Sequence, residues 1–504
     1  MADTLQKFKE YLENLGYYEH VVTQLQWDLQ TQTPKKGYEK KIEVMTHFST
    51  EAFEMQTAEE YGQMLNALSE AESFKQLDEG MQITVKRRKK SFEEDKRIPQ
   101  DFYEEMVRAN AHSEKAWEEA KEADDFSIFE PHLQKMIDYS KQLVGYTKPD
   151  MDVYDALLDM YEEGMDSETV DRLFTELKEG LVTLLKKIAK KPEPDNSKFQ
   201  GEYDVNKQRE WSKFLLEYIG FDMEAGVMSE SAHPFTMGFG PQDVRVTNHY
   251  RVAEPIDAMY SIIHEGGHGI FEQGVDACYA GIDVEKIGFL GLHESQSRFY
   301  ENILGRNINF WKPIYEKLGE YLPKFKEISL EDFYKEINHV VPSCIRTMAD
   351  EVTYSLHIVL RYELEKAIFR EGISAKELPK MWMDKMEELI GVRPESDKDG
   401  ILQDIHWAGG SFGYFPTYAL GNIYDGMFLE AAEAELGDLD TILAEGRVKD
   451  VTKWLHEKIH KFGSLRTSKE VIEKVCGKEI SAKPILKYFE EKYAKLYELN
   501  QVNL

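Results

Sequence analysis

The sequence predicts a mainly helical fold, with a large body of two lobes, a groove between the lobes and one small β-hairpin. Apolar residues near the N-terminus, Leu5, Phe8, Leu12 and Leu15, recur at the spacing of an amphipathic helix. The chain has 504 residues, which exceeds the size at which single hydrophobic cores usually stop growing, so we expect at least two lobes. A groove between lobes is a common place for a ligand site.

Helical patterns continue along most of the chain. The N-terminal helix is expected to continue through residues 17–31 and to end near Pro34. Long, charged amphipathic stretches follow to about Leu143, and a further helix is expected from about residue 167 to about residue 189. These elements form the predicted helical body.

Residues 190–204 (KKPEPDNSKFQGEYD) collect Pro, Asp, Asn, Ser and Gly, a composition typical of a linker. We therefore expect one functional unit over residues 1–504. In it, an N-terminal helical lobe, residues 1–190, flanks the groove. A second lobe, residues 205–504, carries the functional site together with the C-terminal helices.

Residues 234–250 interrupt the helical pattern. Two extended stretches, PFTMGF and DVRVTNHY, flank Gly240-Pro241, and this arrangement predicts a small hairpin. A small sheet beside a functional helix would offer an edge on which an extended peptide could dock.

Composition and charge exclude several classes of protein. The hydrophobic share is 42% and the mean hydropathy is −0.54, values that fit a soluble globular protein. With 62 basic and 93 acidic residues, the net charge of −31 opposes binding to nucleic acid or to an anionic membrane. The three cysteines form no paired motif, no apolar run reaches membrane-span length, and the N-terminus shows no signal peptide. We expect a cytoplasmic protein.

An HExxH motif occupies residues 264–268. Residues four apart on a helix lie on one face, so His264 and His268 could reach one ion, with Glu265 beside them. Apolar residues flank the motif and predict a buried helix. Gly266 and Gly267 each cost a helix interior about 0.8–1 kcal/mol relative to alanine. The pair indicates the close approach of either a peptide substrate or another helix.

A second HExxH motif occupies residues 456–460. Lys453, Lys458 and Lys461 surround its histidines, and a cation near a divalent ion is unfavourable. No acidic residue with an apolar approach follows this motif. We interpret the second motif as an exposed helix face without a functional metal.

A third ligand for the first motif is expected from a second helix, because a catalytic zinc usually takes three protein ligands. Glu294 begins such a predicted helix after an apolar approach. His293 is the competing ligand, but adjacent helical residues point about 100° apart, so both are not expected to bind. We favour Glu294 because a His-His-Glu set suits peptidase chemistry, as in glutamate-type zincins.

Six elements in order resemble those of the carboxypeptidase Taq family of metallocarboxypeptidases. They are HPF at residues 233–235, DxRxT at 243–247, HEGGH at 264–268, HESQ at 293–296, RxxAD at 346–350 and GxxQDxHW at 400–407. WDLQTQTPKKG from Trp27 and YDALLDMYEEGM from Tyr154 also resemble the family. The resemblance therefore extends over nearly the whole chain.

The resemblance implies a metal-dependent carboxypeptidase that hydrolyses the C-terminal peptide bond of short peptides, with broad tolerance of side chains. It also implies a helical fold with a deep groove and one zinc ion, or a cobalt ion, at its floor. A homodimer is implied as well. In this chain, His264, His268 and Glu294 match the family's metal ligands.

Candidate catalytic residues follow from the chemistry of peptide hydrolysis. Glu265 would act as the general base that takes a proton from water and passes it to the leaving amine. The oxyanion needs a donor besides the metal, and we rank His406 first, then Tyr418, then Tyr414. For either tyrosine, packing in the core or groove is the alternative role.

Candidate substrate-binding residues follow from the need to recognise a free carboxylate, which arginine pairs with in a bidentate manner. Arg346 is our first choice and Arg245 our second. The alternative roles are internal ion pairs, of Arg346 with Asp350 and of Arg245 with Asp243. His233 could line the groove or serve as a packed, hydrogen-bonded histidine.

Two other functions stay open at this point. One is an oligoendopeptidase or dipeptidyl carboxypeptidase of the related helical zinc-peptidase type, because HWAGGSFGYFPTYALG is similar to a segment of oligoendopeptidases. The other is a non-catalytic helical binding protein whose metal is structural or absent. Structural zinc sites often use cysteine, and the motif contains none.

Overall fold

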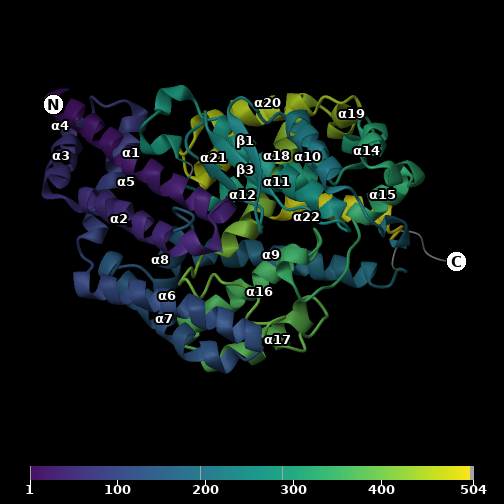
Figure 1. Ribbon diagram of the computed structural model, residues 1–504, viewed down its shortest axis with the longest axis horizontal. Helices are drawn as coiled ribbons and strands as arrows, with labels where there is room; N and C mark the ends of the chain where they lie inside the picture. Colours follow the sequence, from purple (N-terminus) through teal and green to yellow (C-terminus); the bar gives the residue numbers. More distant parts are fainter. Residues whose placement is uncertain (1, 193–194, 287, 500–504) are drawn as a thin grey trace.

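The computed structural model describes residues 2–192, 195–286 and 288–499 (Figure 1). The first ten helices are α1 (Ala2–Thr31), α2 (Tyr38–Thr57), α3 (Glu59–Ser69), α4 (Ala71–Phe74), α5 (Glu79–Asp95), α6 (Gln100–Ala123), α7 (Phe126–Thr147), α8 (Val153–Asp159), α9 (Ser167–Ile188) and α10 (Val205–Ile219).

The sheet and the later helices are β1 (Gly226–Glu230), β2 (Thr236–Gly238), β3 (Val244–Asn248), α11 (Pro255–Gln273), α12 (Leu290–Arg298), α13 (Ile308–Trp311), α14 (Tyr315–Tyr321), α15 (Leu330–Ile337), α16 (Tyr354–Lys366), α17 (Leu378–Leu389), α18 (Pro416–Leu436), α19 (Leu439–Ala444), α20 (Val448–Lys458), α21 (Ser468–Cys476) and α22 (Lys483–Leu496). The predicted mainly helical fold with one small sheet is confirmed.

Helices α1 to α5 gather on one side of the molecule (Figure 1). They enclose a small apolar core of their own, in which Phe8 of α1, Leu65 of α3 and Val85 of α5 are completely buried. A much larger core extends through the rest of the described chain.

Helix α9 packs against α16, and α7 contacts the turn at residues 375–377 that precedes α17, so segments from distant parts of the sequence meet here (Figure 1). Helix α9 confirms the prediction for residues 167–189. It begins after Asp166, whose side chain accepts a hydrogen bond from the Thr169 amide, and its apolar stripe is buried. Of the expected linker, residues 193–194 lie outside the described residues, and the division into lobes at that segment stays a prediction.

The centre of the molecule is built on α11, which packs against α10, α12 and β3, while α12 packs along α18. The sheet has the order β1-β3-β2. Strands β2 and β3 are antiparallel, with Met237 opposite Arg245, so the predicted hairpin is confirmed. Strand β1 pairs in parallel with β3 and was not predicted, because five residues at a sheet edge carry little pattern.

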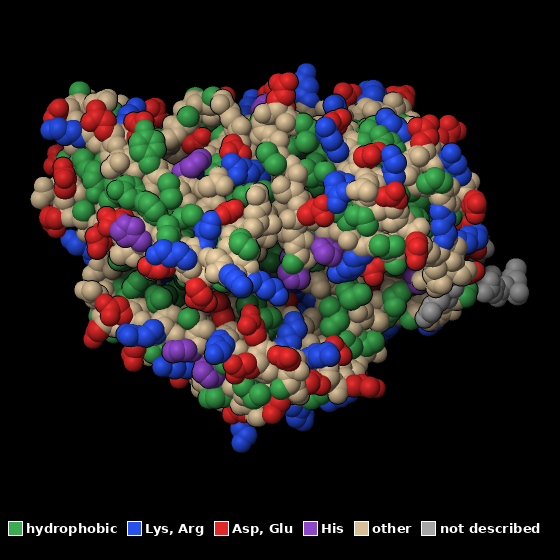
Figure 2. All heavy atoms as spheres, in the orientation of Figure 1, with side chains coloured by type: hydrophobic (Ala, Val, Ile, Leu, Met, Phe, Trp, Pro, Cys, Tyr) green, Lys and Arg blue, Asp and Glu red, His purple; other side chains and the backbone are tan. Residues whose placement is uncertain are grey.

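Figure 2 shows that one face of the molecule is hollowed across its middle, where charged and histidine side chains gather. None of the described helices has both the length and the apolar character required to cross a membrane.

Candidate functional site

Helix α11 carries the first HExxH motif in one continuous helix. Pro255 occupies its first turn, where a missing amide hydrogen costs nothing, and Glu265 is buried within it. The glycine pair admits neighbouring helices. A Cβ at Gly266 would lie 2.7 Å from Ile219 of α10, and one at Gly267 would lie 2.8 Å from the Gln296 carbonyl oxygen of α12. Of the two alternatives, the close approach is therefore that of other helices.

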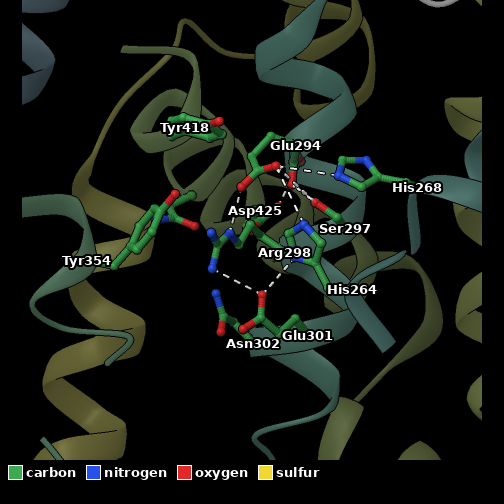
Figure 3. Close-up of polar contacts among 12 residues, drawn as sticks. His264, His268, Glu294, Ser297, Arg298, Glu301, Asn302, Tyr354, Tyr418 and Asp425 are labelled. Atoms are coloured by element: carbon green, nitrogen blue, oxygen red, sulfur yellow. Dashed lines mark hydrogen bonds and ion pairs between the residues drawn. The ribbon is translucent and has the colours of Figure 1, made fainter. Parts of the chain in front are cut away.

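Three side chains from α11 and α12 converge on one small volume (Figure 3). The Nε2 atoms of His264 and His268 lie 3.8 Å and 3.6 Å from Oε2 of Glu294. Within the described residues, this is the one group of three or more His, Cys, Asp or Glu side chains whose ligand atoms all lie within 4.8 Å of one another. Two imidazoles and one carboxylate fit a catalytic divalent metal ion such as zinc.

Charged side chains contact His264 and Glu294 on one side of this three-residue group. Nδ1 of His264 lies 2.9 Å from Oε2 of Glu301, and Arg298 contacts both carboxylates, at 2.7 Å for Glu294 and 3.1 Å for Glu301. Burial acts in the opposite direction, but Arg298 holds the pKa of Glu294 well below its usual range. The pKa of Glu301 falls to about 2 for the same reason. Both carboxylates therefore stay ionised.

The other histidine has a different neighbour. Nδ1 of His268 lies 2.5 Å from Nδ1 of His293, whose Nε2 lies 3.0 Å from Oε1 of Glu272. Burial, with His293 nearby, lowers the pKa of His268 to about 3, so the imidazole is neutral. His293 thus faces His268 and not the volume shared by the three converging side chains.

The hairpin supports Glu265. The Thr236 hydroxyl of β2 donates to Oε2 of Glu265 at 2.7 Å and lies 3.0 Å from its backbone oxygen. Burial raises the pKa of Glu265, which favours acceptance of a proton. The carboxylate is therefore fixed beside the histidines by a neighbouring strand.

His406, Tyr414 and Tyr418 form an aromatic cluster. Nε2 of His406 lies 3.3 Å from the Tyr418 hydroxyl, and the two tyrosine rings meet edge to face with centroids 5.4 Å apart. Burial lowers the pKa of His406 to about 4, so this histidine is a neutral donor or acceptor. Tyr418 belongs to the close-up of polar groups around Glu294 (Figure 3).

Arg346 lies beneath the aromatic cluster, with its guanidinium 5.2 Å from the ring centroid of Tyr418. Its ion-pair partner is Asp404, at 2.8 Å, and not Asp350 as the spacing suggested. Asp350 instead accepts hydrogen bonds from the backbone amides of residues 352 and 353. Asp404 also pairs with Arg361, which is completely buried. One carboxylate thus serves two guanidinium groups.

The remaining candidates lie at the sheet. Arg245 makes the internal pair with Asp243 that was its alternative role, with contacts of 2.7 Å and 2.8 Å, and its guanidinium lies 4.1 Å from the Phe239 ring centroid. His233 is exposed, so it is not a packed histidine. Neither residue lies among the three converging side chains.

The second HExxH motif does not form one helix face. Helix α20 ends at Lys458, between the two histidines. His460 is completely buried, and its Nε2 lies 2.8 Å from Oε1 of Gln296. The interpretation of this motif as an exposed helix face is therefore wrong for His460.

Several residues around the cluster were missed in the sequence: Thr236, Glu272, Arg298 and Glu301. A signal existed for three of them, because residues 294, 298 and 301 follow helical spacing and so share one face, as do residues 268 and 272. The contact of Thr236 depends on how separate elements meet, which spacing does not reveal.

A helical body that carries HExxH on one helix and a third carboxylate on the next has the architecture of a glutamate-type metallopeptidase. The model of the carboxypeptidase Taq (M32) metallopeptidase family matches residues 7–493. The chain belongs to this family and is a metallocarboxypeptidase, a hydrolase that acts on peptide bonds.

Relatives resemble the chain over nearly its full length. Carboxypeptidase 1 of Bacillus subtilis (strain 168) is 39% identical over 495 residues, with 98% of each chain covered. Thermostable carboxypeptidase 1 of Thermus thermophilus is 37% identical over 502 residues, again with 98% of each covered. The crystal structure of M32 carboxypeptidase from Deinococcus radiodurans R1 gives a TM-score of 0.95 at 32% identity, covering 98% of this chain and 100% of that one.

Proposed function

We propose that the chain removes C-terminal residues from short peptides, with broad tolerance of side chains, by means of one divalent ion per chain. His264, His268 and Glu294 would hold that ion, with zinc as the first candidate and cobalt as the second. The proposal is carried by the convergence of their three ligand atoms within 4.8 Å. A divalent ion there would polarise the scissile carbonyl and lower the pKa of a water molecule towards about 7.

Glu265 is the general base of this proposal. It takes a proton from the attacking water and later delivers it to the leaving amine. Its contact with the Thr236 hydroxyl fixes one carboxylate oxygen at 2.7 Å and leaves the other for water. The pKa of Glu265 is raised by burial, which brings it closer to the range in which a carboxylate both accepts and releases a proton.

Arg346 receives the free carboxylate of the substrate. Asp404 neutralises one positive charge, but Arg346 and Arg361 supply two, so the buried cluster keeps a net charge of about +1 for an incoming anion. His406 and Tyr418, beside Arg346, donate hydrogen bonds to the oxyanion. Tyr414, Arg245 and His233 line the route of the peptide.

We further propose a homodimer in the cytoplasm, in which residues 1–190 form a helical lobe that flanks the groove. These features rest on the family resemblance and on the acidic, cysteine-poor composition. Sedimentation analysis of the purified chain tests the dimer.

Paired peptides test the proposed reaction. A peptide with a free C-terminus and its C-terminally amidated twin are incubated with zinc-loaded, cobalt-loaded and chelated protein, and the products are read by mass spectrometry. We expect stepwise loss of C-terminal residues from the free peptide alone, and none after chelation. Equal cleavage of both peptides, or internal cleavage, would contradict the proposal in favour of an endopeptidase.

Replacement of Arg346 by Gln tests carboxylate recognition. A charge-assisted bidentate contact contributes about 1.5–3 kcal/mol, so kcat/KM should fall by about 10- to 150-fold for the free peptide. R245Q is the matched variant, since Arg245 has its own partner in Asp243. A larger loss for R245Q than for R346Q would reverse the assignment.

A further inference from the structure

The two histidines of the proposed metal site are supported in different ways. His264 has a carboxylate, Glu301, directly at its Nδ1 atom, at 2.9 Å. His268 has another imidazole there, with the two Nδ1 atoms 2.5 Å apart. The ring nitrogen of a metal-binding histidine that does not bind the metal usually donates its hydrogen to a carboxylate, a backbone carbonyl or water. The contact of His268 with a second imidazole is therefore unusual.

The contacts of the two rings assign a partner to each nitrogen. Nε2 of His293 lies 3.0 Å from Oε1 of Glu272, and its other nitrogen, Nδ1, meets Nδ1 of His268 at 2.5 Å. Because Nδ1 of His268 is occupied by this contact, its Nε2 is the nitrogen directed at Glu294, 3.6 Å away.

The surrounding elements are shaped to hold this arrangement. Glu272 follows His268 by four residues and so lies on the same face of α11. Its second oxygen lies against Gly238 of β2, where a Cβ would be only 2.8 Å away. The Phe271 ring packs on His293 with centroids 5.6 Å apart.

We propose that Glu272 and His293 are positioning residues that fix His268 with Nε2 toward the ion and thereby set how tightly the metal is held. The inference rests on the proposed metal site. Helix α12 then contributes two residues to the proposed metal site. Glu294 provides a ligand atom, and His293, one residue earlier, acts through His268. Neither positioning residue belongs to the group of three candidate metal ligands.

Zinc affinity is the direct test, measured by competition with a chromophoric chelator on the full-length protein. Outer partners of metal ligands typically contribute 10- to 100-fold in affinity, so H293L should raise the dissociation constant for zinc by that factor. H293N should restore most of the affinity, because an amide oxygen can accept near the place of Nδ1. E272Q should weaken binding by less than H293L does.

The double variant E272Q/H293L shows whether Glu272 acts through His293 or independently of it. If Glu272 acts through His293, the double variant should bind zinc no more weakly than H293L alone. Hydrolysis by H293L should recover most of its loss at saturating zinc, which a collapsed groove would not permit.

Wild-type affinity in H293L, equal loss in H293N and H293L, or fully additive losses in the double variant would each overturn the inference. Failure of the proposed function has a different signature, since the wild type itself would then bind no zinc or would not cleave peptides at the C-terminus.

Discussion

The chain contains two HExxH motifs, and the helix continues through both histidines in only one of them. At residues 264–268 both histidines extend from one uninterrupted helix, α11, and their Nε2 atoms face Glu294. At residues 456–460 helix α20 ends at Lys458, and His460 begins a short 3-10 turn. The same five-residue pattern therefore places the two imidazoles on one face only where the helix continues.

The acidic residues of the two motifs also differ. Glu265 is buried and held by Thr236 of the sheet. Glu457 is exposed and pairs with Lys461 at 2.7 Å. A base for proton transfer needs a fixed, desolvated position, which the first motif provides and the second does not.

The second motif nevertheless supports the first. His460 contacts Gln296 of α12, and its ring lies 5.1 Å from that of Phe271 in α11. It also packs against Gly274, where a Cβ would meet the Cβ of His460 at 2.5 Å. A histidine that resembles a ligand in sequence thus serves as a buried bridge between the two helices that carry the proposed metal ligands.

Removal of one imidazole from each motif should give the largest contrast. H268A should lose the ion and reduce peptide hydrolysis by more than about a thousandfold, because the ion supplies several kcal/mol of transition-state stabilisation. H456A should leave both properties within about twofold. Metal content by mass spectrometry and kcat/KM measure the two effects. Comparable losses in both variants would mean that the motifs share a function.

The acidic residues give the next contrast. E265Q should retain metal and lose about 10²- to 10⁴-fold in kcat, the usual contribution of a general base. E457Q should leave kcat unaltered, since Glu457 lies on the surface. Steady-state kinetics on metal-loaded protein measures both. Appreciable turnover by E265Q would remove Glu265 from its role.

The two histidines of the second motif should differ in their contribution to stability. H460A should lower the free energy of unfolding by about 2–4 kcal/mol, because it leaves a cavity and removes the partner of Oε1 of Gln296. H456A should change it by less than about 0.5 kcal/mol, because this side chain is only half-buried. Urea denaturation of the two variants compares them. If H456A destabilised as much as H460A, the bridging role would be lost.

The burial of His460 should also have a smaller effect, on the pH dependence of the free energy of unfolding. Burial, with His456 nearby, lowers the pKa of His460 to about 3, whereas an unfolded histidine titrates near 6.5. Between these values the unfolded chain binds the extra proton, so this group reduces stability as the pH falls, by up to about 1.4 kcal/mol per pH unit.

Unfolding of the wild type and of H460Q at pH 7, 6 and 5 isolates this effect, because the other titrating groups are common to both. The wild type should lose stability more steeply. Parallel profiles would show that His460 is not buried in its neutral form.

Much of this contrast could be predicted from the sequence, because it depends on local spacing. Helical periodicity places His264 and His268 on one face, and an apolar approach marks the helix of Glu294. The lysines around the second motif indicated a poor metal site. The burial of His460 could not be predicted, because it depends on where α20 ends and on which helices meet there.

Contacts between distant elements set the rest of the site. Arg346 pairs with Asp404 and not with Asp350, the residue four positions later. Residues Arg346–Met348 form a 3-10 turn, so the helical i+4 relation between Arg346 and Asp350 does not apply. Gly266 and Gly267 signalled a close approach, but only the fold identifies the neighbours as α10 and α12. Local sequence patterns predict the helices and strands, whereas the packing of these elements determines which residues contact one another.

Anomalous diffraction at the zinc edge, from crystals grown with zinc, tests the central contrast most directly. The account predicts one strong peak per chain, bonded to Nε2 of His264, Nε2 of His268 and a carboxylate oxygen of Glu294, with no peak at His456 or His460. A peak at the second motif, or a bound ion that leaves Glu294 out of its coordination, would contradict it.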